Sequence, residues 1–117
     1  MRILITGSRK WFDWNTFNDA LNKATKDQSD IVIVHGDCPT GADSMAKDWA
    51  LYQSVIQEPH PAEWDRYGKR AGYVRNAEMV ELGADLCLAF IKFGSPGSTM
   101  TANLAEKKGI EVRRYLA

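Results

Sequence analysis

The sequence predicts an α/β protein with a Rossmann-like, three-layer architecture around a mostly parallel sheet of about five strands. Short apolar runs alternate with helix-length amphipathic segments from one end of the chain to the other. Three of those runs are followed directly by a turn that contains glycine. Strands that are separated by helix-length segments form parallel sheets with right-handed crossovers and helices on both faces.

The predicted strands form a strong and a weak group. Residues 2–6, 31–34 and 86–90 are continuous apolar or β-branched runs, and such runs indicate strands that are buried on both faces. Residues 54–57 and 111–115 are weaker candidates. Together the two groups supply the strands of the predicted sheet.

Between the strands, apolar side chains recur at helical spacing. The first helix is expected to start near Asp13 or Asn15. The residues that share one face are Phe17, Leu21 and Ala24, then Ala42, Met45, Ala46, Trp49 and Ala50, then Val74, Ala77, Met79 and Val80, and finally Met100, Leu104 and Ala105. Because neither a repeat nor a linker interrupts the alternation, residues 1–117 are expected to form one domain.

Composition narrows the classes of partner. Fifteen basic residues balance fifteen acidic ones, so no bulk charge attracts the chain to nucleic acid or anionic lipid, and recognition by charge must be local. Single-stranded DNA binding is disfavoured for the same reason. The chain has no segment that reads as a signal peptide or a membrane span, and a cytoplasmic protein without a membrane partner is expected. Two cysteines far apart in sequence do not make a disulfide framework.

The first glycine turn is Gly7-Ser8-Arg9, directly after a predicted strand. Glycine allows close backbone approach, a serine hydroxyl can bond an anion, and arginine can grip a phosphate with two parallel N–H bonds. In an open parallel sheet such turns lie at the carboxyl edge, where helix N-termini present N–H groups and partial positive charge to anions. The turn therefore predicts a contact with a phosphate.

The second turn runs from Gly36 to Gly41 and leads into a helix headed by Ala42 and Asp43. Its amides could form an anion-binding nest, and Gly36, Gly41 and Asp43 are candidate ligand contacts. Asp43 could equally be a stabiliser of the first helical turn. The lysine of a Walker A loop and the Gly-x-Gly-x-x-Gly fingerprint are both absent, which disfavours P-loop ATP hydrolysis and conventional NAD oxidoreductases.

The third turn offers Gly97, Ser98 and Thr99 at the start of the last helix. Ser98 could instead be the helix N-cap. Where the first and fourth strands are neighbours at the switch point of a doubly wound sheet, Arg9 and Gly97 reach the same crevice.

The least regular segment is 58–72, which carries two prolines and is expected to be a long loop over the carboxyl edge. Its Trp64, Tyr67, Arg66 and Arg70 could supply an aromatic face and positive charge above a ligand. The sequence leaves open whether this segment is a lid or a contact in a homo-oligomer.

Arg75 and Asn76, early in the following helix, are further candidates for the ligand site, against the alternative of a solvated helix face with a cap. His35 and Cys38 have a metal-like spacing, but no second pair of ligands accompanies them, so no metal site is predicted. His60 could be a general base or simply an exposed side chain.

These motifs, taken in order, resemble the small YspA-type proteins of the SLOG superfamily, which also includes DprA and the LOG enzymes. The stretches that carry the resemblance are Gly7-Ser8-Arg9 with Trp11 and Asp13, His35-Gly36 with Gly41-Ala42-Asp43, Pro61-Ala62-Glu63-Trp64 with Gly68 and Ala71-Gly72, Arg75-Asn76 with Met79-Val80, Ala84-Asp85-Leu86, and Gly97-Ser98-Thr99. The resemblance covers nearly the whole chain and implies a Rossmann-like fold whose carboxyl edge binds a nucleotide or a nucleotide-derived ligand. It also implies that the three turns, with Arg75 and Asn76, form the pocket.

One departure from the LOG pattern bears on activity. LOG enzymes carry a glutamate after their Pro-Gly-Gly-x-Gly-Thr signature, and Ala102 stands at the matching position here. The favoured hypothesis is therefore a domain that senses or sequesters a nucleoside phosphate or an NAD- or ADP-ribose-like molecule, with no required cofactor. The alternative is an enzyme that cleaves an N-glycosidic bond with a carboxylate from another loop, such as Glu58, Glu63 or Asp37.

Overall fold

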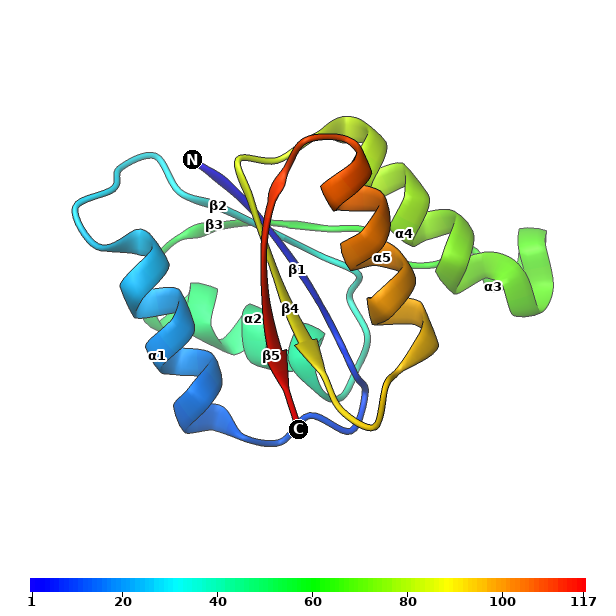
Figure 1. Ribbon diagram of the computed structural model, residues 1–117, viewed down its shortest axis with the longest axis horizontal. Helices are drawn as coiled ribbons and strands as arrows, with labels where there is room; N and C mark the ends of the chain where they lie inside the picture. The colour runs from blue at the N-terminus through cyan, green and yellow to red at the C-terminus, as the bar shows by residue number, and fades with distance from the viewer.

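Apolar, β-branched runs build the sheet of this protein, and amphipathic segments cover it. The computed structural model describes residues 1–117 as a five-stranded, all-parallel sheet flanked by helices (Figure 1). The elements in chain order are β1 (Arg2–Gly7), α1 (Trp14–Thr25), β2 (Val32–His35), α2 (Ala42–Tyr52), β3 (Ile56–Pro59), α3 (Trp64–Tyr67), the 3-10 helix η1 (Gly68–Arg70), α4 (Ala71–Leu82), β4 (Leu86–Ile91), α5 (Pro96–Lys107) and β5 (Glu111–Leu116). The predicted Rossmann-like α/β class is confirmed.

The strand order is β3-β2-β1-β4-β5. The chain therefore builds outward from β1 in one direction through β2 and β3, and then resumes on the other side of β1 with β4. In this register Gly7 at the end of β1 lies opposite Phe90 of β4. The point at which the order reverses is where ligands bind in open α/β sheets, outside the carboxyl ends of the strands.

Alternate residues of the central strands enter two different cores. Ile3 and Ile5 of β1 face α1 and α2, and together with Phe17, Trp49 and Phe90 they belong to the larger core cluster. Leu4 of β1 faces the opposite way, into a smaller cluster with Met79 of α4 and Ala105 of α5. Figure 1 shows α1 and α2 on one side of the sheet and α4 and α5 on the other. No helix is both long and apolar enough to cross a bilayer.

The structure corrects three local predictions. The weak strand at 54–57 is found at Ile56–Pro59, where it is an edge strand that can end in proline because one side of it has no partner. Most of the segment 58–72, which was expected to be a loop, lies in regular elements: the end of β3, α3, η1 and the first two residues of α4. Ala77, which the apolar spacing predicts on the buried face of α4, is exposed. Arg75 and Asn76 of the same helix are buried instead.

A three-residue ion network ties β1 to β3. The Glu58 carboxylate accepts hydrogen bonds from Arg2 Nη1 and Nη2, both at 2.9 Å, and contacts His60 Nε2 at 2.8 Å. The bonds from Arg2, followed by the contact with His60, lower the pKa of Glu58 to about 2. Glu58 is therefore bound in this network and does not reach the edge of the sheet where β1 and β4 end.

The lowered pKa of Glu58 predicts a specific dependence of stability on acid. Protons bind more tightly to Glu58 in the unfolded chain than in the folded one. Its contribution to stability is therefore present above the ordinary pKa of 4.5 and is lost as the pH falls toward the folded-state pKa of about 2. Chemical denaturation of Glu58→Gln should show less stability than wild type near neutral pH and a smaller loss between about pH 5 and pH 2. The exposed Glu63→Gln is the control, and equal pH profiles for Glu58→Gln and wild type would contradict the prediction.

Candidate functional site

A cavity of about 430 Å³ opens at the carboxyl edge of the sheet, at the switch point between β1 and β4. This volume is in the range of small-molecule sites. Its wall is formed by the β1–α1 turn, the start of α2, the α3–η1 segment, α4 and the β4–α5 turn. Eight of the eleven predicted site residues line it: Gly7, Ser8, Arg9, Asp43, Arg75, Asn76, Gly97 and Ser98.

The three other predicted residues, Gly36, Gly41 and Thr99, do not line the cavity. Gly41 has φ +75°, and a Cβ there would lie 2.2 Å from the Ser8 carbonyl oxygen. A Cβ on Gly36 would lie 2.5 Å from Arg75 Nη1. Both glycines therefore allow other parts of the cavity wall to pack closely.

The backbone of the first turn is already bonded within the protein. The Ser8 N–H donates to Phe90 O at 2.9 Å, and the Ser8 carbonyl accepts from the N–H groups of Trp11 and Ala42, both at 3.2 Å. The Ser8 hydroxyl accepts from the Lys10 N–H at 3.1 Å. The Ser8 main chain thus joins β4, the first turn and α2, and its amide is not available to an anion.

Free amide groups are found instead at the N-terminus of α5. Ser95 is the N-cap of this helix and makes no capping bond with its side chain, so the alternative that Ser98 is the N-cap is wrong. Thr99 N–H donates to Ser95 O at 3.0 Å, whereas the N–H groups of Gly97 and Ser98 have no acceptor within the protein. Two amides and the positive end of a twelve-residue helix therefore face the cavity.

Arg75 lines the same cavity as these amides and is only 7% exposed. Its Nε donates to Asn76 Oδ1 at 2.7 Å, and its Nη1 donates to the carbonyl oxygens of Gly36 and of His60, the latter at 3.3 Å. No carboxylate lies within ion-pair distance of the guanidinium. The charge of Arg75 is therefore compensated by neutral hydrogen-bond acceptors and by no ion pair.

Asn76 extends the same cluster. It is 9% exposed, and its Oδ1 is engaged by Arg75. Its Nδ2 would be 3.8 Å from a Cβ on Gly97, which places this donor next to the α5 N-terminus. The alternative of a solvated helix face for Arg75 and Asn76 is therefore wrong.

The cavity is lined by five basic side chains and by a single carboxylate, Asp43. The basic residues are Arg9, Lys10, Lys69, Arg75 and Lys92. The Arg9 guanidinium lies 5.6 Å from the ring centroid of Trp64, so the α3–η1 segment does reach over this edge. In a chain with zero net charge, this excess of positive charge is local.

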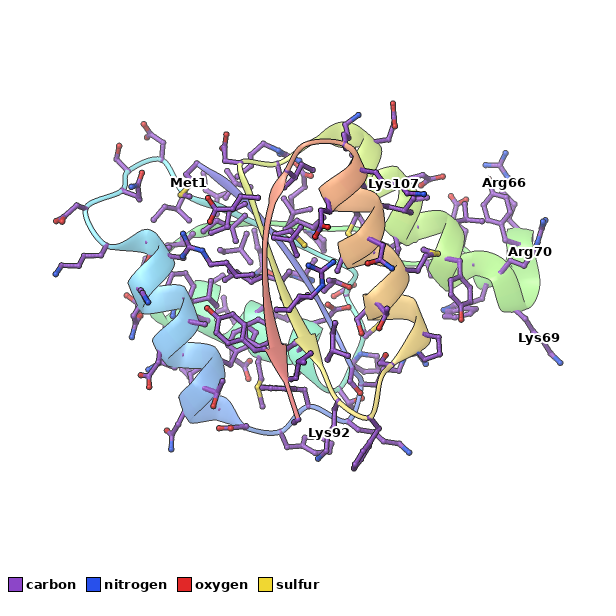
Figure 2. The ribbon with its side chains drawn as sticks, viewed as in Figure 1. Met1, Arg66, Lys69, Arg70, Lys92 and Lys107 are labelled. Carbon is purple, nitrogen blue, oxygen red and sulfur yellow. The ribbon has the colours of Figure 1, made fainter.

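Several lining residues were not predicted, including Lys10, Lys69, Tyr73, Lys92 and Phe93. Figure 2 shows Arg66, Lys69 and Arg70 projecting from the α3–η1 segment, and Lys92 beside the C-terminus. Of Arg66, Lys69 and Arg70, only Lys69 lines the cavity. The positive charge that was expected from Arg66 and Arg70 above a ligand therefore comes from Lys69. The position of Lys92 just after a predicted strand is the one feature of the sequence that could have placed this residue at the carboxyl edge.

Asp43 lies in the first turn of α2 and also lines the cavity, so its contact with a ligand stays a prediction. It is 7% exposed and accepts a hydrogen bond from the Cys38 N–H at 3.3 Å. Burial, followed by the charge of Asp43, raises the pKa of the Cys38 thiol. Cys38 Sγ lies 3.9 Å from Arg75 Nη2.

The effect of Asp43 on Cys38 can be measured by alkylation. Asp43→Asn removes the negative charge but keeps an oxygen acceptor, so the pKa of Cys38 should fall and iodoacetamide should react at a lower pH than in wild type. Cys87 will not interfere because burial raises its pKa to about 12. Asp48→Asn, an exposed change on the same helix, is the control. An unchanged pH profile in Asp43→Asn would contradict the assigned cause.

The two histidines have structural partners. His35 Nδ1 accepts from the Asp37 N–H at 3.0 Å, and Nε2 lies 2.8 Å from Gln57 Oε1, so the ring is held between β3 and the start of the second turn. His60 contacts Glu58 and lines a different hollow. No group of three or more His, Cys, Asp or Glu side chains is arranged to hold a metal ion.

Comparison with known protein families shows which family the chain belongs to. The family described as "YspA, cpYpsA-related SLOG family" matches residues 1–67, which include the first two glycine turns. The chain belongs to this SLOG family. The resemblance inferred from the motifs is thereby confirmed.

A curated relative extends the comparison of this SLOG protein beyond residue 67. The Gene 61 protein of Mycobacterium phage D29 is 44% identical over 120 residues, covering 97% of this chain and 95% of the relative. The aligned region therefore takes in most of the cavity wall, α4 and the start of α5 included. No solved structure matches the chain.

Proposed function

We propose that this SLOG protein binds a nucleotide or a nucleotide derivative in the cavity at the carboxyl edge, and senses or sequesters it. Membership of the family supports a nucleotide-related role, whether binding or processing. Within that role, the proposal assigns a phosphate of the ligand to the cluster formed by Arg75, Asn76 and the free N–H groups of Gly97 and Ser98.

The buried guanidinium of Arg75 carries this proposal. A buried charged side chain is costly unless it is compensated, and the acceptors of Arg75 within the protein are the Asn76, Gly36 and His60 oxygens and the Cys38 sulfur, none of which is a carboxylate. A phosphate at the α5 N-terminus would supply the missing negative charge and accept from Asn76 Nδ2 as well.

Aromatic side chains support the nucleoside part of the proposal. Trp64, Tyr73 and Phe93 line the same cavity and are 48%, 46% and 80% exposed, respectively. Exposed aromatic rings beside a phosphate site provide faces on which a base can stack. The Arg9 guanidinium lies over the Trp64 ring, so a ligand in the cavity would contact both side chains.

Calorimetric titration with nucleoside monophosphates of each base, NAD and ADP-ribose tests the proposal. Arg9→Ala should weaken the ligand that binds by about tenfold or more and leave the unfolding free energy unchanged within about 0.5 kcal/mol, because Arg9 is exposed. Arg113→Ala, on β5 and outside the cavity, is the matched control. Absence of saturable binding by every compound, with the fold intact, would overturn the proposal.

One observation favours a second candidate, cleavage of an N-glycosidic bond. Asp43 is a buried carboxylate in the cavity wall, where it could stabilise positive charge on the ribose while water adds to C1′ and the base departs with a proton. The three carboxylates considered from sequence, Glu58, Glu63 and Asp37, do not line the cavity. Ala102, at the position of the LOG glutamate, is buried in the core.

Release of free base distinguishes this candidate from binding alone. AMP and NAD should each be incubated with the protein and the products separated by chromatography. If Asp43 acts in catalysis, Asp43→Asn should lower the rate of base release by about 100-fold or more while AMP still binds. A wild-type protein that binds a nucleotide and releases no base would exclude the enzyme and retain the binding proposal.

A further inference from the structure

The basic residues of the cavity occupy two depths. Arg75 is buried in the cavity wall. Lys10, Lys69 and Lys92, here called the lysine rim, come from the β1–α1 turn, η1 and the β4–α5 turn. Lys10 and Lys69 are exposed and Lys92 is half-buried, so the rim borders the cavity where it meets solvent.

None of the lysine rim is neutralised within the protein. Ion pairs occupy Arg2, Arg66, Lys108, Arg113 and Arg114 elsewhere on the molecule, but no rim lysine takes part in one. Asp43 is the one carboxylate in the cavity wall. The rim therefore adds a second block of positive charge to that of Arg75, drawn from three separate connections.

The backbone around Lys92 supports a role for the rim. Phe93 has φ +55°, a conformation that bulky side chains rarely adopt, yet its ring is 80% exposed. Its N–H donates to Ala117 O at 3.1 Å, which holds the turn in place. Lys92 Nζ lies 5.3 Å from the Phe93 ring centroid and 6.0 Å from that of Phe12. The two aromatic rings therefore hold the Lys92 ammonium in contact with them at the rim of the cavity.

The two blocks of positive charge lie at different depths of the same cavity, Arg75 buried in the wall and the lysine rim at its border with solvent. A phosphate monoester carries a charge of about −1.5 to −2 at neutral pH, which Arg75 and the α5 N-terminus together can balance. We infer that the lysine rim is a second anion subsite, and that the ligand carries at least two phosphates, as a nucleoside diphosphate or its derivative does. This inference rests on the proposed function and adds the number of phosphates to it.

The test compares AMP with ADP, and inorganic phosphate with pyrophosphate, by calorimetry at fixed ionic strength. ADP should bind at least about tenfold more tightly than AMP, and pyrophosphate more tightly than phosphate, because each adds charge-assisted bonds. Lys10→Ala combined with Lys92→Ala should abolish most of the ADP advantage and leave AMP affinity within about threefold. Lys23→Ala with Lys26→Ala, two exposed lysines of the α1 C-terminal end, makes the same change in net charge away from the cavity and should leave the advantage intact.

Each outcome separates the inference from the proposed function. Equal affinities for AMP and ADP would overturn the second subsite and leave nucleotide binding standing. Preference for pyrophosphate over phosphate with no affinity for any nucleotide would retain the subsite and overturn the proposed function. An ADP advantage that persists in the rim variant would assign it to other residues, and absence of binding by all four probes would overturn both.

Discussion

Gly41→Ala is expected to prevent folding or to cost more than about 4 kcal/mol of unfolding free energy. The added Cβ would lie 2.2 Å from the Ser8 carbonyl oxygen and 2.5 Å from Arg9 Cα, both of them backbone atoms that cannot rotate away. Relief would require the first turn to move away from α2, which breaks the bond from the Ala42 N–H to Ser8 O. The positive φ of +75° adds backbone strain.

Gly109→Ala is the matched control for this change. Its φ is +88°, close to that of Gly41, but nothing lies within 4 Å of the added Cβ. It should cost only the backbone strain, about 1–2 kcal/mol. Urea denaturation followed by circular dichroism measures both variants, and equal losses would mean that the close approach of the first turn to α2 does not govern stability.

Arg75→Ala is expected to affect both stability and binding. It leaves the carbonyl oxygens of Gly36 and His60 without the Arg75 donor and opens a space in the wall, which should cost about 2–4 kcal/mol of unfolding free energy. At a temperature where the variant stays folded, nucleotide affinity should fall at least about tenfold. Chemical denaturation and calorimetric titration report the two effects separately.

Arg66→Ala is the control for Arg75→Ala because it is the same substitution at an exposed site. The Arg66 side chain is 71% exposed, and its pair with Glu63 spans 3.5 Å. Surface pairs contribute little, so stability should change by less than about 0.5 kcal/mol and binding should not change. Wild-type stability in Arg75→Ala would mean that water replaces the guanidinium at the Gly36 and His60 carbonyls.

The fold could be predicted because its signals are local. Continuous apolar runs at β1, β2 and β4 and the helical spacing between them are readable along the chain, and the parallel class follows from their alternation. β3 was misplaced by two residues because it is a half-exposed edge strand with a weak apolar pattern. The segment at 58–72 was misread because its two prolines lie at the end of β3 and before α3, where they interrupt neither element.

The cavity was only partly predictable, because backbone bonding cannot be read from residue types. Gly7-Ser8-Arg9 has the composition of a phosphate-binding turn, yet the Ser8 N–H already donates a hydrogen bond to the Phe90 carbonyl oxygen. Whether Arg75 is exposed or buried depends on the approach of Gly36, which lies 39 residues earlier in the chain. Lys69 and Lys92 carry no motif, and their approach to one cavity is a product of the tertiary fold.

The hydrogen bonds to Ser8 also determine which parts of the cavity wall lose conformational freedom when a ligand binds. The N–H groups of Trp11, Ala42 and Lys10 all bond to Ser8, so this junction of the wall is held by the protein's own hydrogen bonds. Binding then restricts chiefly exposed side chains such as Arg9, at roughly 0.5–1.5 kcal/mol each. Hydrogen exchange at the buried Ala42 amide should accordingly be equally slow with and without nucleotide.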